Sequence, residues 1–298
     1  MKLLAGSSNL PLAKNIAQQL NLEIVDCEIA QFGNGEKRLR IKSDVAGHNI
    51  ALVQSFTTPV DSQIIETLLM TDALERAGAR NVNLIIPWLA YSLQDKVFQT
   101  GEPFSAKVIA NLISNSYVAR VYLLDLHNSS IPGLFSVPTE YLSAQDPFVE
   151  FIKTNLDLKQ AVIVSPDFGG LKSARKLADI LKLPLANIDK DRDLNTGKVT
   201  QVELHGQVKN KTAILFDDVI MSGGTAIKTA KLLKKQAAKK IYFLATHGIF
   251  CNKAQQKLTQ SQLDQIIITN SVQHQQLDDK ITVLDVAPIF ATALKKWL

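Results

Sequence analysis

Cysteine is scarce in this sequence, whose 298 residues include only Cys27 and Cys251. Two thiols so far apart disfavour a disulfide-stapled scaffold and a cysteine-rich zinc site, and they fit a reducing compartment. Long apolar runs are also missing, because no stretch approaches the ~20 residues of a membrane-spanning helix. The apolar run within MKLLAGSS is too short for the core of a signal peptide. We therefore expect a cytoplasmic protein with no membrane partner.

Aromatic residues are few as well, at 6% of the chain, and the Lys and Arg residues are scattered rather than interleaved with aromatics. A stacking platform for single-stranded nucleic acid is therefore not expected. The net charge of +5 and the pI near 9.0 suit anionic ligands. This balance favours phosphorylated small molecules over nucleic acid, although a generically basic surface would have the same composition. No Gly-x₄-Gly-Lys-Ser/Thr motif occurs, which excludes a P-loop kinase.

Short apolar runs alternate with amphipathic stretches along the whole chain. Seven runs are typical of parallel strands covered on both faces, namely residues 50–53, 84–86, 121–124, 162–164, 214–216, 242–245 and 266–268. Apolar residues at helical spacing predict helices over 64–73, with Gly78 near the stop, and over 171–181, closed by Pro184. The alternation predicts an α/β protein with mostly parallel sheets flanked by helices.

A division near residues 143–147 would give two α/β domains of similar size, 1–145 and 146–298, without a strong sequence repeat between them. Three polar loops follow predicted strands, at 88–103, 126–133 and 191–198. In open α/β sheets, ligands bind beyond the carboxyl ends of the strands. We therefore expect the binding residues in these loops.

The segment ILFDDVIMSGGT, residues 214–225, carries the strongest motif: a strand, two carboxylates, and a small-residue loop that enters a helix near Ala226. Asp217 and Asp218 could accept hydrogen bonds from vicinal ribose hydroxyls or hold a metal-bound water. The loop residues let backbone N–H groups approach a phosphate at the positive end of a helix, and they are Ser222, Gly223, Gly224 and Thr225. An acidic turn that caps a helix through Ser222 is the plainer alternative.

This segment resembles the ribose-5-phosphate loop of phosphoribosyltransferases and ribose-phosphate pyrophosphokinases, with Met221 where that loop usually has Asp. Beyond the loop, the chain resembles the ribose-phosphate pyrophosphokinase family (PRPP synthetases) from end to end, beginning with GSSNLPLAKNIA. The resemblance implies two phosphoribosyltransferase-like domains, of which the first is 1–145 and the second 146–298. The last helix could pack on the first domain.

FGNGE is similar to the Phe-x-Asp-Gly-Glu hairpin of that family, with Asn34 in place of Asp. The resemblance implies that the hairpin contacts the ATP of a neighbouring subunit in a homo-oligomer, through Phe32, Asn34, Gly35 and Glu36. From its residues alone, Asn34-Gly35 predicts a plain hairpin with a type I′ turn.

IPWLAYSLQDK resembles the nucleotide loop of the family, in which Gln94 and Asp95 match and Leu93 replaces an Arg. In LLDLHNSSIPGLF, His127 takes the place of a histidine that binds magnesium near the ATP phosphates. A lone His after a strand is otherwise more often a structural hydrogen-bonding residue.

VSPDFGGLKSARKLAD resembles the family's Pro-Asp-His-Gly-Gly turn, with Phe168 in place of His. The resemblance implies that the Asp167 carboxylate is a second ligand for magnesium. IDKDRD is similar to the catalytic Lys-Arg-Arg segment. Lys190 and Arg192 match it, with Arg192 also near the ribose 5-phosphate, and Asp191 replaces the first Arg. A surface charge run is the alternative for this segment.

The resemblance implies a Mg²⁺-dependent enzyme that moves a diphosphate from ATP to C1 of ribose 5-phosphate. A phosphoribosyltransferase, or a regulatory homologue without activity, remains open as an alternative. The stretch VFQTGEPFS lacks arginine, and the chain stops soon after VAPIFATAL. Both features are similar to an archaeal-style branch of the family, for which we expect ADP to inhibit mainly by competing with ATP.

Overall fold

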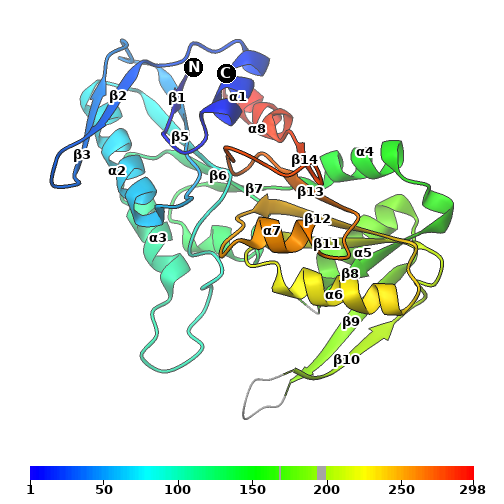
Figure 1. The fold of residues 1–298 in the computed structure, drawn as a ribbon. Helices are drawn as coiled ribbons and strands as arrows, with labels where there is room; N and C mark the ends of the chain where they lie inside the picture. The colour runs from blue at the N-terminus through cyan, green and yellow to red at the C-terminus, as the bar shows by residue number, and fades with distance from the viewer. Residues whose placement is uncertain (168, 193–198) are drawn as a thin grey trace. The chain divides into compact units, whose positions relative to one another are not determined.

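The computed structural model describes residues 1–167, 169–192 and 199–298, except for the side chains of residues 190–192 and 199–202. The chain divides into two compact units (Figure 1). Unit 1 comprises residues 1–143, 271–273 and 285–298, and unit 2 comprises residues 144–270 and 274–284. The end of the chain therefore returns to the unit in which the chain begins.

Unit 1 is built on a five-stranded sheet in which every neighbouring pair of strands is parallel. Across the sheet the strands are β1 (Lys2–Ala5), β4 (Asn49–Val53), β5 (Asn81–Ile86), β6 (Arg120–Leu124) and β7 (Thr139–Leu142). The helices are α1 (Leu10–Leu20), α2 (Val60–Arg76), α3 (Ser105–Ser114), η1 (Ile131–Leu134), α8 (Ala287–Leu294) and η3 (Lys295–Trp297). Helical crossovers cover a parallel sheet, and the three central strands are accordingly buried at every position but the first.

Unit 2 contains a seven-stranded sheet, in which only the pair β9–β10 is antiparallel among the described strands. The order is β10 (Val199–His205), β9 (Leu185–Arg192), β8 (Ala161–Ser165), β11 (Thr212–Ile220), β12 (Lys240–Gly248), β13 (Gln265–Thr269) and β14 (Ile281–Leu284). The helices are α4 (Gln145–Asn155), η2 (Leu158–Gln160), α5 (Leu171–Leu181), α6 (Gly224–Lys235) and α7 (Ala254–Thr259).

The predicted α/β architecture with mostly parallel sheets is confirmed. All seven predicted strands form parts of β4, β5, β6, β8, β11, β12 and β13, and the two predicted helices lie within α2 and α5. The apolar pattern does not indicate β1, β7, β10 and β14, the edge strands of the two sheets, nor the inner strand β9, whose sequence LANIDKDR has no continuous apolar run. Edge strands are short or carry polar residues on their open side, so the continuous apolar run that marks a central strand is lost.

The hairpin formed by β2 (Cys27–Gln31) and β3 (Lys37–Ile41) is a separate antiparallel sheet of unit 1. The predicted type I′ turn at Asn34-Gly35 is wrong. A type I′ turn requires positive φ at both residues, but Gly35 has φ +94° whereas Asn34 is not among the residues with positive φ. The turn is longer, because Gly35 N–H bonds to Phe32 O at 2.9 Å and Phe32 N–H bonds to Glu36 O at 2.8 Å.

The first and last helices of the chain pack together within unit 1, where Figure 1 shows α8 beside α1. Helix α1 begins at Asn9, whose side chain accepts the N–H of Leu12, and it ends at Asn21 in the left-handed conformation. Helix α8 presents Phe290, fully buried, to the interior. No helix among the described residues is long and apolar enough to cross a membrane.

We predict that Phe290→Ala lowers the free energy of unfolding of unit 1 by about 3–5 kcal/mol, because a fully buried ring leaves a cavity. The control is Phe98→Ala, which removes a ring that is 64% exposed and should cost under about 1 kcal/mol. Urea unfolding followed by circular dichroism measures both. Equal losses in the two variants would show that α8 is not part of the core of unit 1.

Candidate functional site

Asp217 and Asp218 lie within β11, which is longer than predicted and continues to Ile220. Strand β8 pairs with β11 only as far as Leu215, so the two carboxylates begin where the neighbouring strand has ended. This edge of a parallel sheet is where ligands bind in open α/β folds. The structure thus places both predicted residues at the carboxyl edge of the sheet of unit 2.

Asp167 and Asp217 come close together across this edge. The turn that follows β8 is closed by the N–H of Gly170, which bonds to Asp167 Oδ1 at 3.1 Å. A β-carbon at position 170 would lie 3.7 Å from Asp217 Oδ1, so the glycine lets the turn approach the second carboxylate. The sequence motif gave no reason to join these two acids, because they belong to segments fifty residues apart.

Burial raises the pKa of the Asp217 carboxyl well above its ordinary value, and the negative charges of Asp218 and Asp167 raise it further. Asp217 Oδ1 accepts the N–H of Asp218 at 3.0 Å, which compensates only part of this cost. A carboxylate in such surroundings gains from any ligand that supplies hydroxyl donors or positive charge. The arrangement therefore suits either of the two roles that the sequence leaves open.

The loop after β11 is shaped by Gly223, which has φ +72° and precedes helix α6. A β-carbon there would lie 2.7 Å from Leu258 Cγ, so both the backbone conformation and the packing require glycine. Because Gly223 has no side chain to cap the helix, the N–H groups of the first turn remain available to an anion. The helix begins at Gly224 rather than near Ala226, so its unsatisfied N–H groups lie closer to Ser222 and Gly223 than predicted.

A neighbouring segment fixes the loop. The N–H groups of Ile249 and Phe250 bond to Ile220 O at 2.9 and 3.1 Å, and the N–H of Cys251 bonds to Met221 O at 2.9 Å. Sequence reasoning missed this support and that of Leu258. One residue in the sequence, Gly248 at the end of β12, indicates a turn before this segment. The hydrogen bonds between residues 249–251 and 220–221 depend on tertiary structure and could not be predicted.

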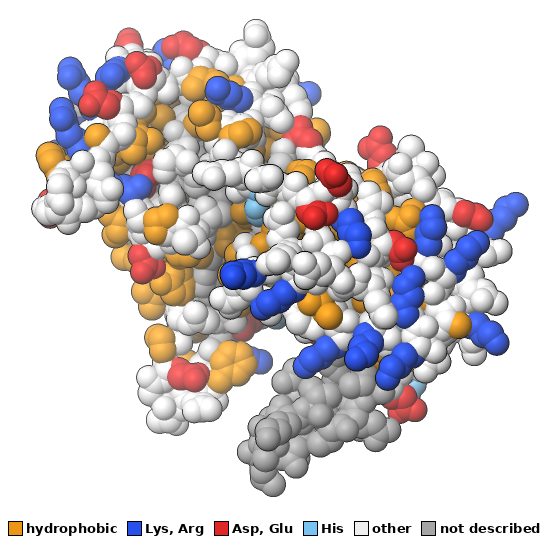
Figure 2. All heavy atoms as spheres, in the orientation of Figure 1, with side chains coloured by type: hydrophobic (Ala, Val, Ile, Leu, Met, Phe, Trp, Pro, Cys, Tyr) orange, Lys and Arg blue, Asp and Glu red, His pale blue; other side chains and the backbone are white. Residues whose placement is uncertain are grey.

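Helix α6 carries exposed lysines on one face, at positions 228, 231 and 235. Figure 2 shows Lys side chains gathered over this part of unit 2. Met221 and Ser222 are exposed at the loop itself, and Thr225 is exposed on the first turn of α6. The positive surface raises the local concentration of anions around the loop.

In unit 1, the loops after β5 and β6 meet at their carboxyl ends. Asn128 Nδ2 donates to Asp95 Oδ2 at 2.7 Å, and Asn128 Oδ1 accepts the N–H of Ser130 at 2.9 Å. Since His127 precedes Asn128, the structure brings the predicted Asp95 and the exposed His127 into one loop cluster. Sequence reasoning assigned no role to Asn128, although it lies inside a motif already singled out.

Gln94 is held at the start of α3. Its Oε1 accepts the hydroxyl of Ser105 at 2.6 Å, and its backbone O accepts the N–H of Ala106 at 3.2 Å. Only the amide nitrogen of this side chain is thus left as a donor for a nucleotide. Phe32, at the tip of the β2–β3 hairpin, is 53% exposed, and Asn34, Gly35 and Glu36 are exposed beside it.

Lys190 and Arg192 lie in β9, where their backbones pair with Val202 and Val199 of β10. The loop predicted from residue 191 therefore starts later, since β9 continues to Arg192. The side chains of both residues and the segment 193–198 lie outside the described part of the chain, as does Phe168.

No group of three or more His, Cys, Asp or Glu side chains among the described residues could hold a metal ion by itself. Asp167 has a carboxylate oxygen in unit 2, and His127 has an imidazole nitrogen in unit 1. Mg²⁺ is usually held by one or two carboxylates, several waters and the phosphates of a substrate rather than by a closed protein cage. Each of these two groups, taken within its own unit, is of a type that such binding can use.

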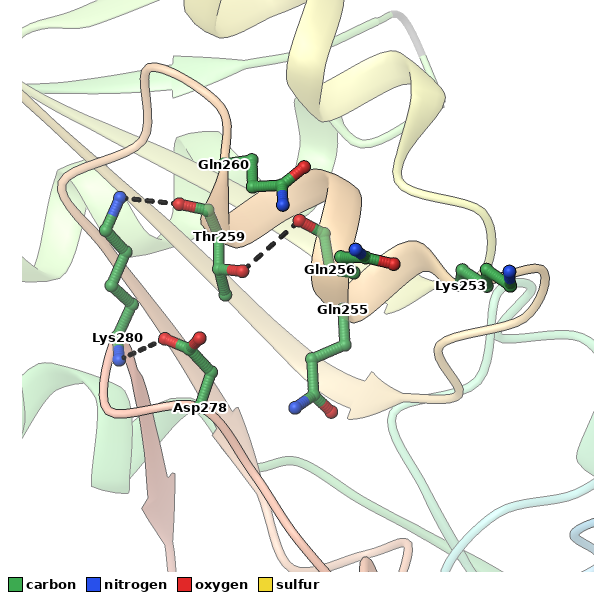
Figure 3. Close-up of a pocket in the computed structure, with 7 residues that line it drawn as sticks. All are labelled: Lys253, Gln255, Gln256, Thr259, Gln260, Asp278 and Lys280. Carbon is green, nitrogen blue, oxygen red and sulfur yellow. Dashed lines mark hydrogen bonds between the residues drawn. The ribbon is translucent and has the colours of Figure 1, made fainter.

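A pocket of about 580 Å³ lies on unit 2 beside α7 (Figure 3). It is lined by Lys253, Gln255, Gln256, Thr259, Gln260, Asp278 and Lys280. Lys280 Nζ donates to Thr259 O at 2.6 Å, so this ammonium group serves to end α7. None of the predicted site residues lines the pocket, and we assign it no role.

Known proteins of one family are similar to this chain over almost its whole length. Residues 1–116 match the model of the N-terminal domain of ribose phosphate pyrophosphokinase, and residues 194–297 match the phosphoribosyl synthetase-associated domain. The chain is 38% identical to the ribose-phosphate pyrophosphokinase of Thermotoga maritima and 37% identical to that of Bacillus caldolyticus, each over 99% of this chain and 94% of the relative. It is similar to the crystal structure of phosphoribosylpyrophosphate synthetase from Mycobacterium smegmatis, with a TM-score of 0.92, 32% identity, and coverage of 99% and 97%.

We predict that Asp217→Asn stabilises the ligand-free protein at neutral pH, because it removes a buried charge while Asn Oδ1 can still accept the N–H of Asp218. A raised pKa in the folded state means that this cost is absent below the ordinary Asp pKa, grows as the pH rises from that value and is complete above the folded pKa. The melting temperatures of the two proteins should agree near pH 4, and the variant should exceed the wild type by about 2–4 °C at pH 8, roughly 1 kcal/mol at this size. A difference that does not change with pH would contradict the assigned cause.

Proposed function

This chain belongs to the ribose-phosphate pyrophosphokinase family, and we propose that it transfers the diphosphate group of ATP to the C1 hydroxyl of ribose 5-phosphate, releasing AMP. One observation carries the proposal: relatives with this name align with 99% of the chain at 37–38% identity. The oxygen of the C1 hydroxyl attacks the β-phosphorus, and the bond from that phosphorus to the oxygen shared with the α-phosphate breaks. The hydroxyl proton leaves, and AMP departs with the bridging oxygen.

The ribose 5-phosphate site is assigned to the carboxyl edge of β11 in unit 2. The phosphate is bound by the N–H groups at the start of α6 together with the hydroxyls of Ser222 and Thr225, while Met221, Gly223 and Gly224 shape the loop. Asp217 and Asp218 accept hydrogen bonds from the vicinal ribose hydroxyls. These bonds lower the free-energy cost of keeping the buried Asp217 carboxylate charged.

The nucleotide site is assigned to unit 1. Asp95, held by Asn128, and the amide nitrogen of Gln94 bind the nucleoside, and His127 lies near the phosphates. The hairpin tip of a second subunit completes the site through Phe32, Asn34, Gly35 and Glu36, so the proposal includes a homo-oligomer. The exposed apolar ring of Phe32 supports this role, because it gains burial only against another surface.

Magnesium is the proposed metal, for which His127 would provide a ligand near the ATP phosphates in unit 1 and Asp167 would take the second magnesium role in unit 2. When bound, it neutralises phosphate charge in the transition state. Asp167 is fixed for this task, since its Oδ1 accepts the N–H of Gly170 and its backbone O accepts the hydroxyl of Ser165 at 2.7 Å.

Lys190 and Arg192 are the proposed catalytic residues. Phosphoryl-type transfer needs positioning and charge stabilisation more than covalent chemistry, and two cations beside the bridging and β-phosphate oxygens supply both. We further propose that residues 1–145 and 146–298 are the two domains of the enzyme. The proposed compartment is the cytoplasm.

We predict that the wild-type protein with Mg·ATP and ribose 5-phosphate forms AMP, and that Lys190→Ala lowers kcat by on the order of 100-fold or more with little change in KM for ribose 5-phosphate. Chromatography of the nucleotides measures the rate, and Lys209→Ala, a change at an exposed lysine, is the control. Unchanged turnover in Lys190→Ala would remove this residue from the mechanism. No AMP from the wild type would indicate a regulatory homologue, and base-dependent release of diphosphate would indicate a phosphoribosyltransferase.

We also predict that Asp217→Asn, although stabilising without ligand, raises KM for ribose 5-phosphate by about tenfold and KM for ATP by less than about twofold. A lost hydrogen bond to a charged acceptor costs roughly 1.5–3 kcal/mol, and only the sugar makes that bond. Initial rates over both substrates separate the two constants. A larger rise in KM for ATP would show that the two substrate sites have been exchanged.

A further inference from the structure

The hairpin β2–β3 depends on unit 1 for its stability. A two-stranded ribbon is marginal on its own in water. Its strands pair Cys27 with Ile41, Ile29 with Leu39 and Gln31 with Lys37. The first two pairs pack against the core of unit 1. Because side chains alternate along a strand, Lys37 points to the same inner face as Leu39 and Ile41. A lysine therefore occupies the inner position nearest the turn, where an apolar residue would continue the pattern.

Lys37 reaches a buried acid on helix α2. Its ammonium group forms an ion pair with Oε2 of Glu66, and the two side chains are 15% and 0% exposed. A carboxylate without access to water is costly unless donors surround it. Glu66 Oε1 accepts the N–H of Ser7 and the amide of Gln54, both at 2.8 Å, and Oε2 also accepts the hydroxyl of Ser7 at 2.8 Å. Lys37 is the cation of this set.

The partners of Glu66 cannot easily move. Gln54 is fully buried, and its Oε1 accepts the N–H and the hydroxyl of Ser8 at 3.1 and 2.6 Å. A β-carbon at Gly6 would overlap that same amide, at 2.2 Å from Oε1. Glu66 is thus fixed by the turn after β1 and by the end of β4, so its pair with Lys37 fixes the hairpin relative to the sheet.

The pair also lies one peptide bond from the turn. Lys37 follows Glu36, whose backbone O accepts the N–H of Phe32 at 2.8 Å, and Gln31, opposite Lys37, donates to Gly35 O at 2.7 Å. An ion pair with defined geometry restricts the direction of the strand as well as its distance from α2. The apolar contacts of Leu39 and Ile41 with the core lie farther from the turn and are not directional.

We propose that Lys37 and Glu66 are positioning residues that orient the turn 32–36 for binding the nucleotide. This inference rests on the proposed function, which assigns that turn to ATP. The pair touches no substrate. Its effect on the reaction is exerted through the turn, and it should alter KM for ATP rather than kcat.

The test uses the full-length protein with Lys37→Met/Glu66→Gln, which removes both charges together and leaves no buried charge unpaired. The matched control is Lys42→Met, since Lys42 pairs with Glu28 at 3.3 Å at the exposed end of the same hairpin. Amide hydrogen exchange by mass spectrometry reports on residues 32–36, and initial rates give kcat and both KM values.

We expect exchange in the turn to accelerate by about fivefold or more in the double variant and KM for ATP to rise by about fivefold, with kcat and KM for ribose 5-phosphate within about twofold. Lys42→Met should change neither. Lys37→Arg, which keeps a cation for Glu66, should give smaller changes, and Glu66→Gln, which leaves only the partly exposed Lys37 without its partner, serves as the test if the double variant does not fold.

Unchanged exchange in the turn would overturn the proposal, whatever the activity. Faster exchange with an unchanged KM for ATP would equally overturn the positioning role, and it would remove the hairpin from the proposed nucleotide site. If the wild type forms no AMP, the proposed function fails by itself, and the exchange experiment still decides whether the ion pair orders the turn.

Discussion

Parallel strands have all of their carboxyl ends at one edge of a sheet, and this constraint decides where both units can carry polar chemistry. Helical crossovers cover the faces, so the strands between them are buried and apolar. Polar side chains that follow different strands are then brought together at the edge. In unit 1 this joins Asp95 after β5 to Asn128 after β6, and in unit 2 it brings Asp167 after β8 near Asp217, which lies in β11 beyond its pairing with β8.

Two buried carboxylates show how differently such positions can be used. Glu66 is surrounded by a lysine, a serine and a glutamine, so its charge is compensated and its surroundings are rigid. Asp217 has acidic neighbours instead, and burial together with their charge raises its pKa. The surroundings of Glu66 stabilise the fold. The surroundings of Asp217 disfavour its charged form, and a ligand with hydroxyl donors would reduce that free-energy cost. This difference in surroundings, rather than the residue type, distinguishes Glu66 from Asp217, for which we propose a binding role.

The sequence predicted the central strands well because their apolar runs are continuous and short, as for residues 50–53 and 266–268. It failed at the sheet edges, where β1, β7, β10 and β14 lose that pattern, at the inner strand β9, where polar residues interrupt it, and at the turn of the hairpin. There Asn34-Gly35 favours a type I′ turn, but the hydrogen bonds from Phe32 and Gly35 select a longer one. Local propensity is decisive only where packing and longer-range hydrogen bonds do not compete with it.

By itself, the sequence determined the α/β class, the glycine loop before α6 and the residue types able to bind phosphate, ribose and metal. These features depend on neighbours within about a dozen residues, and such local patterns are readable from one chain. Tertiary structure alone decided that Asp167 lies near Asp217, that Leu258 excludes any side chain at Gly223, and that Lys37 pairs with Glu66. Each of these contacts joins segments far apart in the chain, and their formation depends on the packing of the whole unit.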